Sequence, residues 1–197
     1  MFPYIFDMGQ RIKTEVEGIA ANWLFLAGWN FGGANIAAAS DTGVKAAVTL
    51  ADGETTEVTT GITSPAVPRA LRIKGNQAGV TGNVVIEGTN YLGEAITETI
   101  AANAGSAVEG NKAFKTVTKI TFPARAGAGD TISVGWNDKL GLPYLLSRNT
   151  VLAAFLDNAK EGTAPTVTTS ATAIESNTID LNSALNNKPV YAILILP

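Results

Sequence analysis

The chain has 197 residues, of which 46% are apolar and 16% are charged, and its formal net charge is −3 at pH 7. It contains no cysteine and no histidine, which excludes disulfides, thiolate or imidazole metal ligands and the commonest general base near neutral pH. The basic residues are scattered except in two RIK segments at 11–13 and 72–74, so no nucleic-acid partner is expected.

The N-terminal segment MFPYIFD alternates Phe2, Tyr4 and Phe6 with Pro3 and Ile5. Alternation of this kind predicts a strand, and Pro3 would confine that strand to the edge of a sheet. A strand at a free terminus can add itself to another sheet. A disordered terminus is the alternative.

Apolar residues at helical spacing follow this segment: Ile12, Val16, Ile19, Trp23 and Leu26. They share one stripe of a helix, and Thr14 with Glu17 can form its capping box. Gly18 disfavours a helix by about 1 kcal/mol. The pattern predicts a short helix that packs on its own domain or, alternatively, docks on a neighbouring subunit.

Residues 18–40 carry no charge and are long enough to span a membrane. Three Asn and four Gly interrupt them, so no membrane partner is expected. We expect residues 1–40 to form an apolar arm that is covered by protein. Because interfaces concentrate aromatic anchors, the candidate interface residues of this arm are Trp23, Phe25, Trp29 and Phe31.

From about residue 43 the chain consists of short runs of β-formers separated by turn residues, at a spacing near ten residues. The expected strands are 44–50, 55–60, 70–74, 83–89, 95–101, 113–122, 131–136, 150–155, 165–169, 177–181 and 190–196. This rhythm predicts an all-β, antiparallel sandwich-like domain over residues 41–197. The last strand, VYAILIL, is apolar on both faces, which predicts a central strand that is covered on both sides.

Two turns predict hairpins. ADGE at 51–54 places an Asp-Gly turn between the expected strands 44–50 and 55–60. GTNYLGEA at 88–95 predicts a longer loop between 83–89 and 95–101. Two features indicate edges or rims: Glu98 interrupts an apolar strand face, and a bulge between Lys115 and Val117 would restore alternation within 113–122.

The sequence offers little chemistry. Glu87 and Glu98 could approach one another across a hairpin as a carboxylate pair for glycoside hydrolysis, although solvent-facing roles are favoured. Asn137 and Asp138 in GWNDKLG provide only two side chains toward a calcium site that needs six or more oxygens. We therefore expect no enzyme activity, no catalytic residue, no cofactor and no metal.

The segments VTTGITSPAVPRALRIKGN, VVIEGTNYLGEAITETI, GNKAFKTVTKITFP and DKLGLPYLL resemble a group of structural proteins of tailed bacteriophages. The resemblance covers roughly residues 41–197 and consists of turns and strand faces without a catalytic signature. It implies an accessory capsid protein, a decoration or cement protein that binds the outer head surface and bridges capsomers. The implied partners are the major capsid protein and copies of the chain itself as a homotrimer, in a virion part that is made in the host cytoplasm.

Two alternatives remain open. The same domain would serve as a tail, baseplate or fibre component, which is also structural. A carbohydrate-binding module for a host surface is the alternative from another class, with Tyr91, Trp136 and Tyr144 as stacking platforms.

Overall fold

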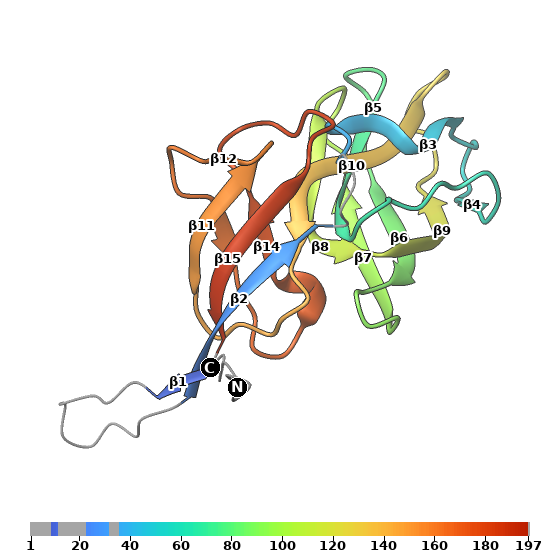
Figure 1. Cartoon of the computed structure of the whole chain (residues 1–197). Helices are drawn as coiled ribbons and strands as arrows, with labels where there is room; N and C mark the ends of the chain where they lie inside the picture. Colours follow the sequence, from blue (N-terminus) through green and yellow to red (C-terminus); the bar gives the residue numbers. More distant parts are fainter. Residues whose placement is uncertain (1–8, 12–22, 32–35, 197) are drawn as a thin grey trace.

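The computed structural model describes residues 9–11, 23–31 and 36–196 (Figure 1). Within these residues every strand pairing is antiparallel, and the one helical element is a 3-10 turn, Ile174–Ser176. The predicted antiparallel all-β architecture is therefore confirmed. No helix of the described ranges is long and apolar enough to cross a membrane.

The strands form three sheets. The first sheet has the order β1 (Gly9–Arg11), β2 (Trp23–Asn30), β15 (Val190–Leu196), β11 (Val151–Leu156) and β12 (Ala159–Lys160). The second has the order β13 (Thr166–Thr168), β14 (Thr178–Asp180), β10 (Thr131–Gly141), β5 (Arg69–Gly75) and β8 (Ala107–Phe114), and β3 (Ser40–Thr49) also pairs with β10. The third has the order β4 (Thr56–Val58), β9 (Thr116–Phe122), β6 (Asn83–Thr89) and β7 (Ala95–Ala101).

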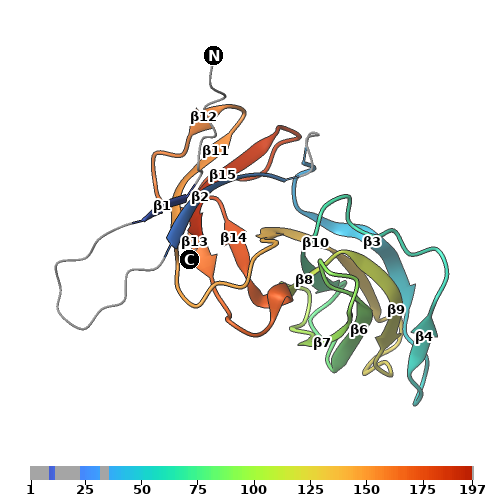
Figure 2. The same cartoon turned by 60° about the horizontal axis from the view of Figure 1, so that its bottom comes forward.

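Two hydrophobic cores share the long strand β10. Ile132 and Val134 of β10 belong to the first core, which also contains buried residues of the third sheet. Leu140, at the other end of β10, belongs to the second core, which lies against the first sheet. Figures 1 and 2 both show the first sheet on one side of β10 and the third sheet on the other.

Local patterns located several strands correctly. β6, β7 and β15 have the predicted bounds, and β15 lies in the middle of its sheet as predicted. The predicted loop between β6 and β7 is also confirmed. In it the Asn90 side chain accepts hydrogen bonds from the backbone N–H groups of Leu92 and Glu94, and Gly93 takes a positive φ of 87°.

Two predictions about strand partners are wrong. The ADGE turn exists, with Gly53 at a φ of 71°, but β3 pairs with β10 and β4 pairs with β9. The turn therefore links two sheets and closes no hairpin.

The predicted strand 113–122 divides at Lys115 into β8 and β9, which lie in different sheets. The bulge lies instead opposite the step from Glu87 to Gly88, at Thr118.

The helix predicted near the N-terminus is wrong for its last two residues. Trp23 and Leu26 lie in β2, and Leu26 pairs with Ile195 of β15. The other proposed helical residues, together with the capping box and the terminal strand predicted at Phe2, Tyr4 and Phe6, lie outside the described residues. The paired strands 23–30 and 190–196 come from opposite ends of the chain, so part of the predicted arm belongs to the same β-structure as residues 41–196.

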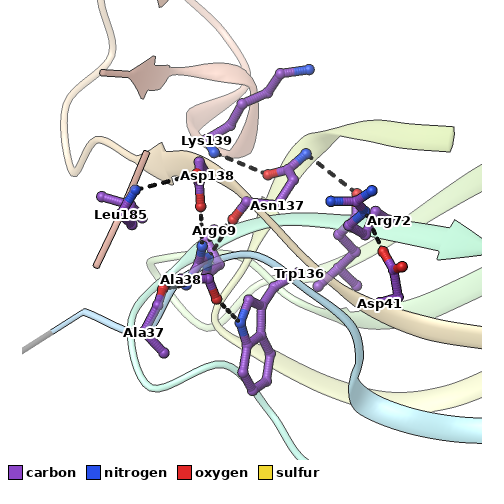
Figure 3. Close-up of polar contacts among 11 residues, drawn as sticks. Ala37, Ala38, Asp41, Arg69, Arg72, Trp136, Asn137, Asp138, Lys139 and Leu185 are labelled. Carbon is purple, nitrogen blue, oxygen red and sulfur yellow. Dashed lines mark hydrogen bonds and ion pairs between the residues drawn. The ribbon is translucent and has the colours of Figure 1, made fainter. Parts of the chain in front are cut away.

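Arg69, at the start of β5, ties distant backbone segments together (Figure 3). Its Nε and Nη2 both donate to the carbonyl oxygen of Asn137, the former at 2.7 Å, and its Nη1 donates to the carbonyl oxygen of Ala37 at 2.9 Å. Nη2 also lies 3.2 Å from a carboxylate oxygen of Asp138. The side chain is 3% exposed. Burial lowers its pKa to about 10 despite the opposing effect of Asp138, so Arg69 remains a cation at neutral pH.

Glu98 links the second and third sheets. β7 lies at an edge of the third sheet, as expected, but the Glu98 carboxylate does not face solvent. One oxygen accepts the backbone N–H groups of Asn111, at 2.6 Å, and Lys112, at 3.2 Å, both in β8. The other is buried without a hydrogen-bond partner among the described residues. Burial raises the pKa of this carboxyl group, although the two N–H groups act in the opposite direction.

Candidate functional site

The first sheet has one packed face and one open face. Alternate residues of β2, β15 and β11 point into the second core and include buried Ala154, Val190, Ala192 and Leu194; Phe31, directly after β2, is buried in the same core. The register places the remaining residues on the opposite side, and none of them is buried. This surface, termed the outer face, consists of Leu26, Gly28, Asn30, Ala153, Phe155, Tyr191, Ile193 and Ile195.

The outer-face residues of β2, β15 and β11 carry no charge, and Lys160 of β12, which pairs with Phe155, lies at the margin of this face. Leu26 is 62% exposed, whereas Phe25, 43% exposed, pairs with Leu196 and points to the other side of the sheet. At the irregularity in β11 between Val151 and Ala153, Leu152 is 57% exposed. Contiguous exposed apolar surface of this kind marks an interaction site in soluble proteins.

This arrangement corrects the prediction that β15 is covered on both sides. Its inner residues Val190, Ala192 and Leu194 are fully buried, whereas Tyr191 and Ile193 on the outer side are half-buried. Among the described residues only one side of the strand is packed into a core. Because the outer residues of β15 are also apolar, we expect them to be covered by contacts that lie outside the described structure.

Gly28 creates a depression in the outer face. A Cβ atom placed on Gly28 would meet nothing within 4 Å. The depression has a volume of about 430 Å³ and is lined by Gly28, Trp29, Asn30, Phe155, Asn158, Tyr191, Ala192 and Ile193. Asn158 is supplied by the tight turn between β11 and β12, where it and Asp157 take positive φ angles of 63° and 52°. Because the lining contains neither carboxylate nor amine, the depression suits an apolar side chain flanked by neutral hydrogen-bonding groups.

The predicted interface residues have different positions. Trp23 lies in β2 and pairs with Arg11 of β1, and its side chain is outside the described structure. Phe25 is exposed, and Trp29 is half-buried. Phe31 is only 3% exposed and is a residue of the second core. Of the four, Phe25 is therefore the residue with the most accessible described side chain.

The three aromatic residues considered for carbohydrate stacking do not form one platform. Tyr91 and Tyr144 both contact Trp29 edge-on, with ring centroids 5.9 and 6.0 Å away. Trp136 lies in β10, where its Nε1 donates to the carbonyl oxygen of Ala38 at 3.1 Å. These rings make internal contacts, so the structure does not favour them as a shared sugar-binding surface.

The proposed carboxylate pair does not converge. Glu98 is paired with Ile86, whereas Glu87 is paired with Thr97, so the two carboxylates lie on opposite faces of the β6–β7 pair. Glu87 instead makes an ion pair with Lys119 at 2.7 Å.

The segment considered for calcium is part of a strand. Asn137 and Asp138 lie in β10, where Asn137 is fully buried and Asp138 pairs with Arg69. In the described part of the chain no group of three or more acidic side chains is placed to hold a metal ion.

Sequence reasoning missed the contributions of Phe155, Ile193 and Ile195 to the outer face. The signal was present in the uninterrupted apolar composition of VYAILIL, but that composition does not say which side of the strand is covered.

Comparison with known proteins gives no match: the chain matches no protein-family model, no curated protein and no solved structure.

Proposed function

We propose that the protein is a virion structural protein of a tailed bacteriophage, a capsid decoration or cement protein that binds the outer head surface and bridges capsomers. The observation that carries this proposal is the outer face, an accessible and mainly apolar sheet surface with a single charged residue, Lys160, at its margin. The resemblance of residues 41–197 to phage structural proteins supports the assignment to a virion. In this role the protein is made in the host cytoplasm and acts by contact, without catalysis, cofactor or nucleic acid.

The outer face is proposed to bind the major capsid protein. Complete burial of a leucine side chain contributes about 1.5–3 kcal/mol. Leu26 is 62% exposed, so covering it would contribute on the order of 1–2 kcal/mol. Because about 1.4 kcal/mol corresponds to a tenfold change in affinity, one polar substitution in this face should have a measurable effect on binding.

The chain provides a matched pair of leucines for this test. Leu92, in the loop between β6 and β7, is 63% exposed and lies outside the outer face. We expect Leu26→Ser to weaken binding to heads that lack this protein by about tenfold, and Leu92→Ser to leave binding unchanged. Cosedimentation with heads measures the affinity, and thermal unfolding checks that both variants remain folded. Equal binding by the two variants would contradict the assignment of the surface.

A second experiment addresses location. Electron microscopy of virions is expected to show the protein at capsomer junctions on the head, and mass spectrometry is expected to give a copy number that matches the head lattice. Density confined to the tail would contradict the decoration role and favour a tail or baseplate component.

We also propose that the protein associates as a homotrimer, the state that the resemblance implies. Sedimentation equilibrium at micromolar concentration is expected to give three times the chain mass of 20.4 kDa. A monomer would restrict trimer formation to the head surface, where neighbouring copies are held at high local concentration.

A further inference from the structure

The depression in the outer face contains a row of small side chains. The register aligns Gly28 of β2 with Ile193 of β15 and Ala153 of β11. Directly paired residues in an antiparallel sheet project from the same face, so the one large side chain in this row is that of Ile193. A Cβ atom on Gly28 would meet nothing within 4 Å. The space beside Ile193 is therefore open.

The neighbouring row supplies two aromatic walls. Tyr191 of β15 pairs directly with Phe155 of β11, both side chains are half-buried, and both line the depression. An aromatic side chain that enters the depression would rest on Ile193 and pack against these rings, and such ring contacts are favourable beyond the area they bury. The volume of about 430 Å³ is large enough for an indole or a phenol ring.

The turn between β11 and β12 places one charge beside the depression. Asp157 and Asn158 form this two-residue turn with positive φ angles, and Lys160 of β12 pairs directly with Phe155. The Lys160 side chain therefore projects from the same face as the Phe155 ring. Asn158 lines the depression itself. The register of the hairpin thus holds a cation next to an aromatic wall.

The charge of Lys160 is not neutralised within the described structure. Lys160 is exposed and takes part in no ion pair among the described residues. Asp157, in the adjoining turn, is already paired with Lys188 at 3.2 Å. Because complementary charges across an interface give specificity, this margin favours a carboxylate on the molecule that occupies the depression.

We propose that the depression receives an aromatic side chain of the partner, and that a carboxylate of the same partner segment pairs with Lys160. The inference rests on the proposed function in one respect, that the partner is the major capsid protein. In this arrangement Gly28 selects the shape of the entering side chain by having none of its own, and Lys160 selects its charge. Leu26, by contrast, contributes apolar area.

Two small probes that share an aromatic ring test the inference without phage heads. Indolepropionate carries a carboxylate, whereas tryptamine carries an amine. We expect indolepropionate to shift the backbone amide resonances of Gly28, Tyr191 and Ile193 saturably in NMR spectra, with an affinity about threefold higher than that of tryptamine, as one exposed ion pair allows. Lys160→Glu should reverse this order, and Gly28→Val should abolish the shifts. The absence of saturable shifts at these amides, or an order that Lys160→Glu leaves unchanged, would overturn the proposal.

Binding to heads that lack this protein separates the inference from the proposed function. Gly28→Val fills the space beside Ile193, and a β-branched residue suits a strand, so this variant should melt like the native chain and bind heads about tenfold more weakly. Gly79→Val is the matched control, because a Cβ atom there also has open space and the residue lies in the loop between β5 and β6. It should bind as the native chain does.

The outcomes for the two ideas differ. If Leu26→Ser weakens head binding but Gly28→Val binds as tightly as Gly79→Val, the depression receives no side chain of the head, and the inference is overturned while the proposed function stands. If the probes bind as expected but neither Leu26→Ser nor Gly28→Val affects head binding, the site is supported and the proposed function is contradicted.

Discussion

Replacing Arg69 by methionine tests whether one buried cation holds the two cores in register. Methionine approximates the length of the arginine stem but cannot donate a hydrogen bond. The substitution would leave the carbonyl oxygens of Asn137 and Ala37 and the carboxylate of Asp138 without the donors that they have in the structure. The Arg69 side chain is 3% exposed and Asn137 is fully buried, so water cannot replace the donors to the Asn137 carbonyl oxygen without local opening.

The expected magnitude follows from the loss of a buried partner. Removing one member of a buried, hydrogen-bonded ion pair costs about 3–5 kcal/mol. With a urea m-value of about 2 kcal/mol per molar, this cost lowers the midpoint of unfolding by roughly 1.5–2.5 M. The midpoint is measured by tryptophan fluorescence and by circular dichroism. Trp136 is well placed for the fluorescence measurement, because its ring centroid lies 5.8 Å from the guanidinium carbon of Arg69.

Asp138→Asn separates the ion pair from the backbone bonds. It removes the negative charge but keeps a side-chain oxygen for the backbone N–H of Leu185, which Asp138 accepts at 3.3 Å. Because Asp138 is 23% exposed, we expect a loss of only about 1 kcal/mol. The reasoning is refuted if Arg69→Met lowers the free energy of unfolding by less than 1 kcal/mol, or if the two substitutions have equal effects.

Three further predictions concern stability. Glu98→Ala should cost about 1–3 kcal/mol because two N–H groups of β8 lose their acceptor. Glu98→Gln keeps an acceptor for these groups and removes a carboxylate charge that burial disfavours, so its urea midpoint at neutral pH should exceed that of the native chain. Burial raises the pKa of Glu98, so the folded state binds the proton more tightly than the unfolded state, and the advantage of Glu98→Gln should disappear as the pH falls well below the ordinary value of 4.5. Gly135→Ala should lower the melting temperature sharply because its Cβ would clash with the Ser40 carbonyl, whereas Gly28→Ala should not, because its Cβ has open space. Removing residues 190–197 should give insoluble protein on expression, since β15 is central to its sheet; a soluble product with cooperative unfolding would contradict this.

The sequence by itself determined the fold class and the position of several strands. Alternation of apolar and polar residues and the turn residues between them are local properties, and they located β6, β7 and β15 correctly. The loop at 90–94 was also accessible, because Asn90 and Gly93 satisfy its backbone over a few residues.

Strand partners were not determined locally. The Asp-Gly turn at 51–54 has the expected backbone, yet the strands on either side pair with β10 and β9. Similarly, the helical spacing of Trp23 and Leu26 was outweighed by pairing with β15, from the other end of the chain. Which strands meet depends on packing between distant segments, and a short window of sequence contains no information about it.

The candidate site was decided by tertiary structure for the same reason. Composition predicted an apolar interface at Trp23, Phe25, Trp29 and Phe31, but none of these residues belongs to the outer face. That face depends on Phe155 and Ile193, which only the sheet brings next to Gly28. Phe31, directly after β2, and Ile193, in β15, are both apolar, and the sequence alone does not distinguish the one that is buried from the one that is accessible. The difference arises because one side of the first sheet packs against Leu140 and its neighbours in the second core, and the described chain places no second layer on the other side.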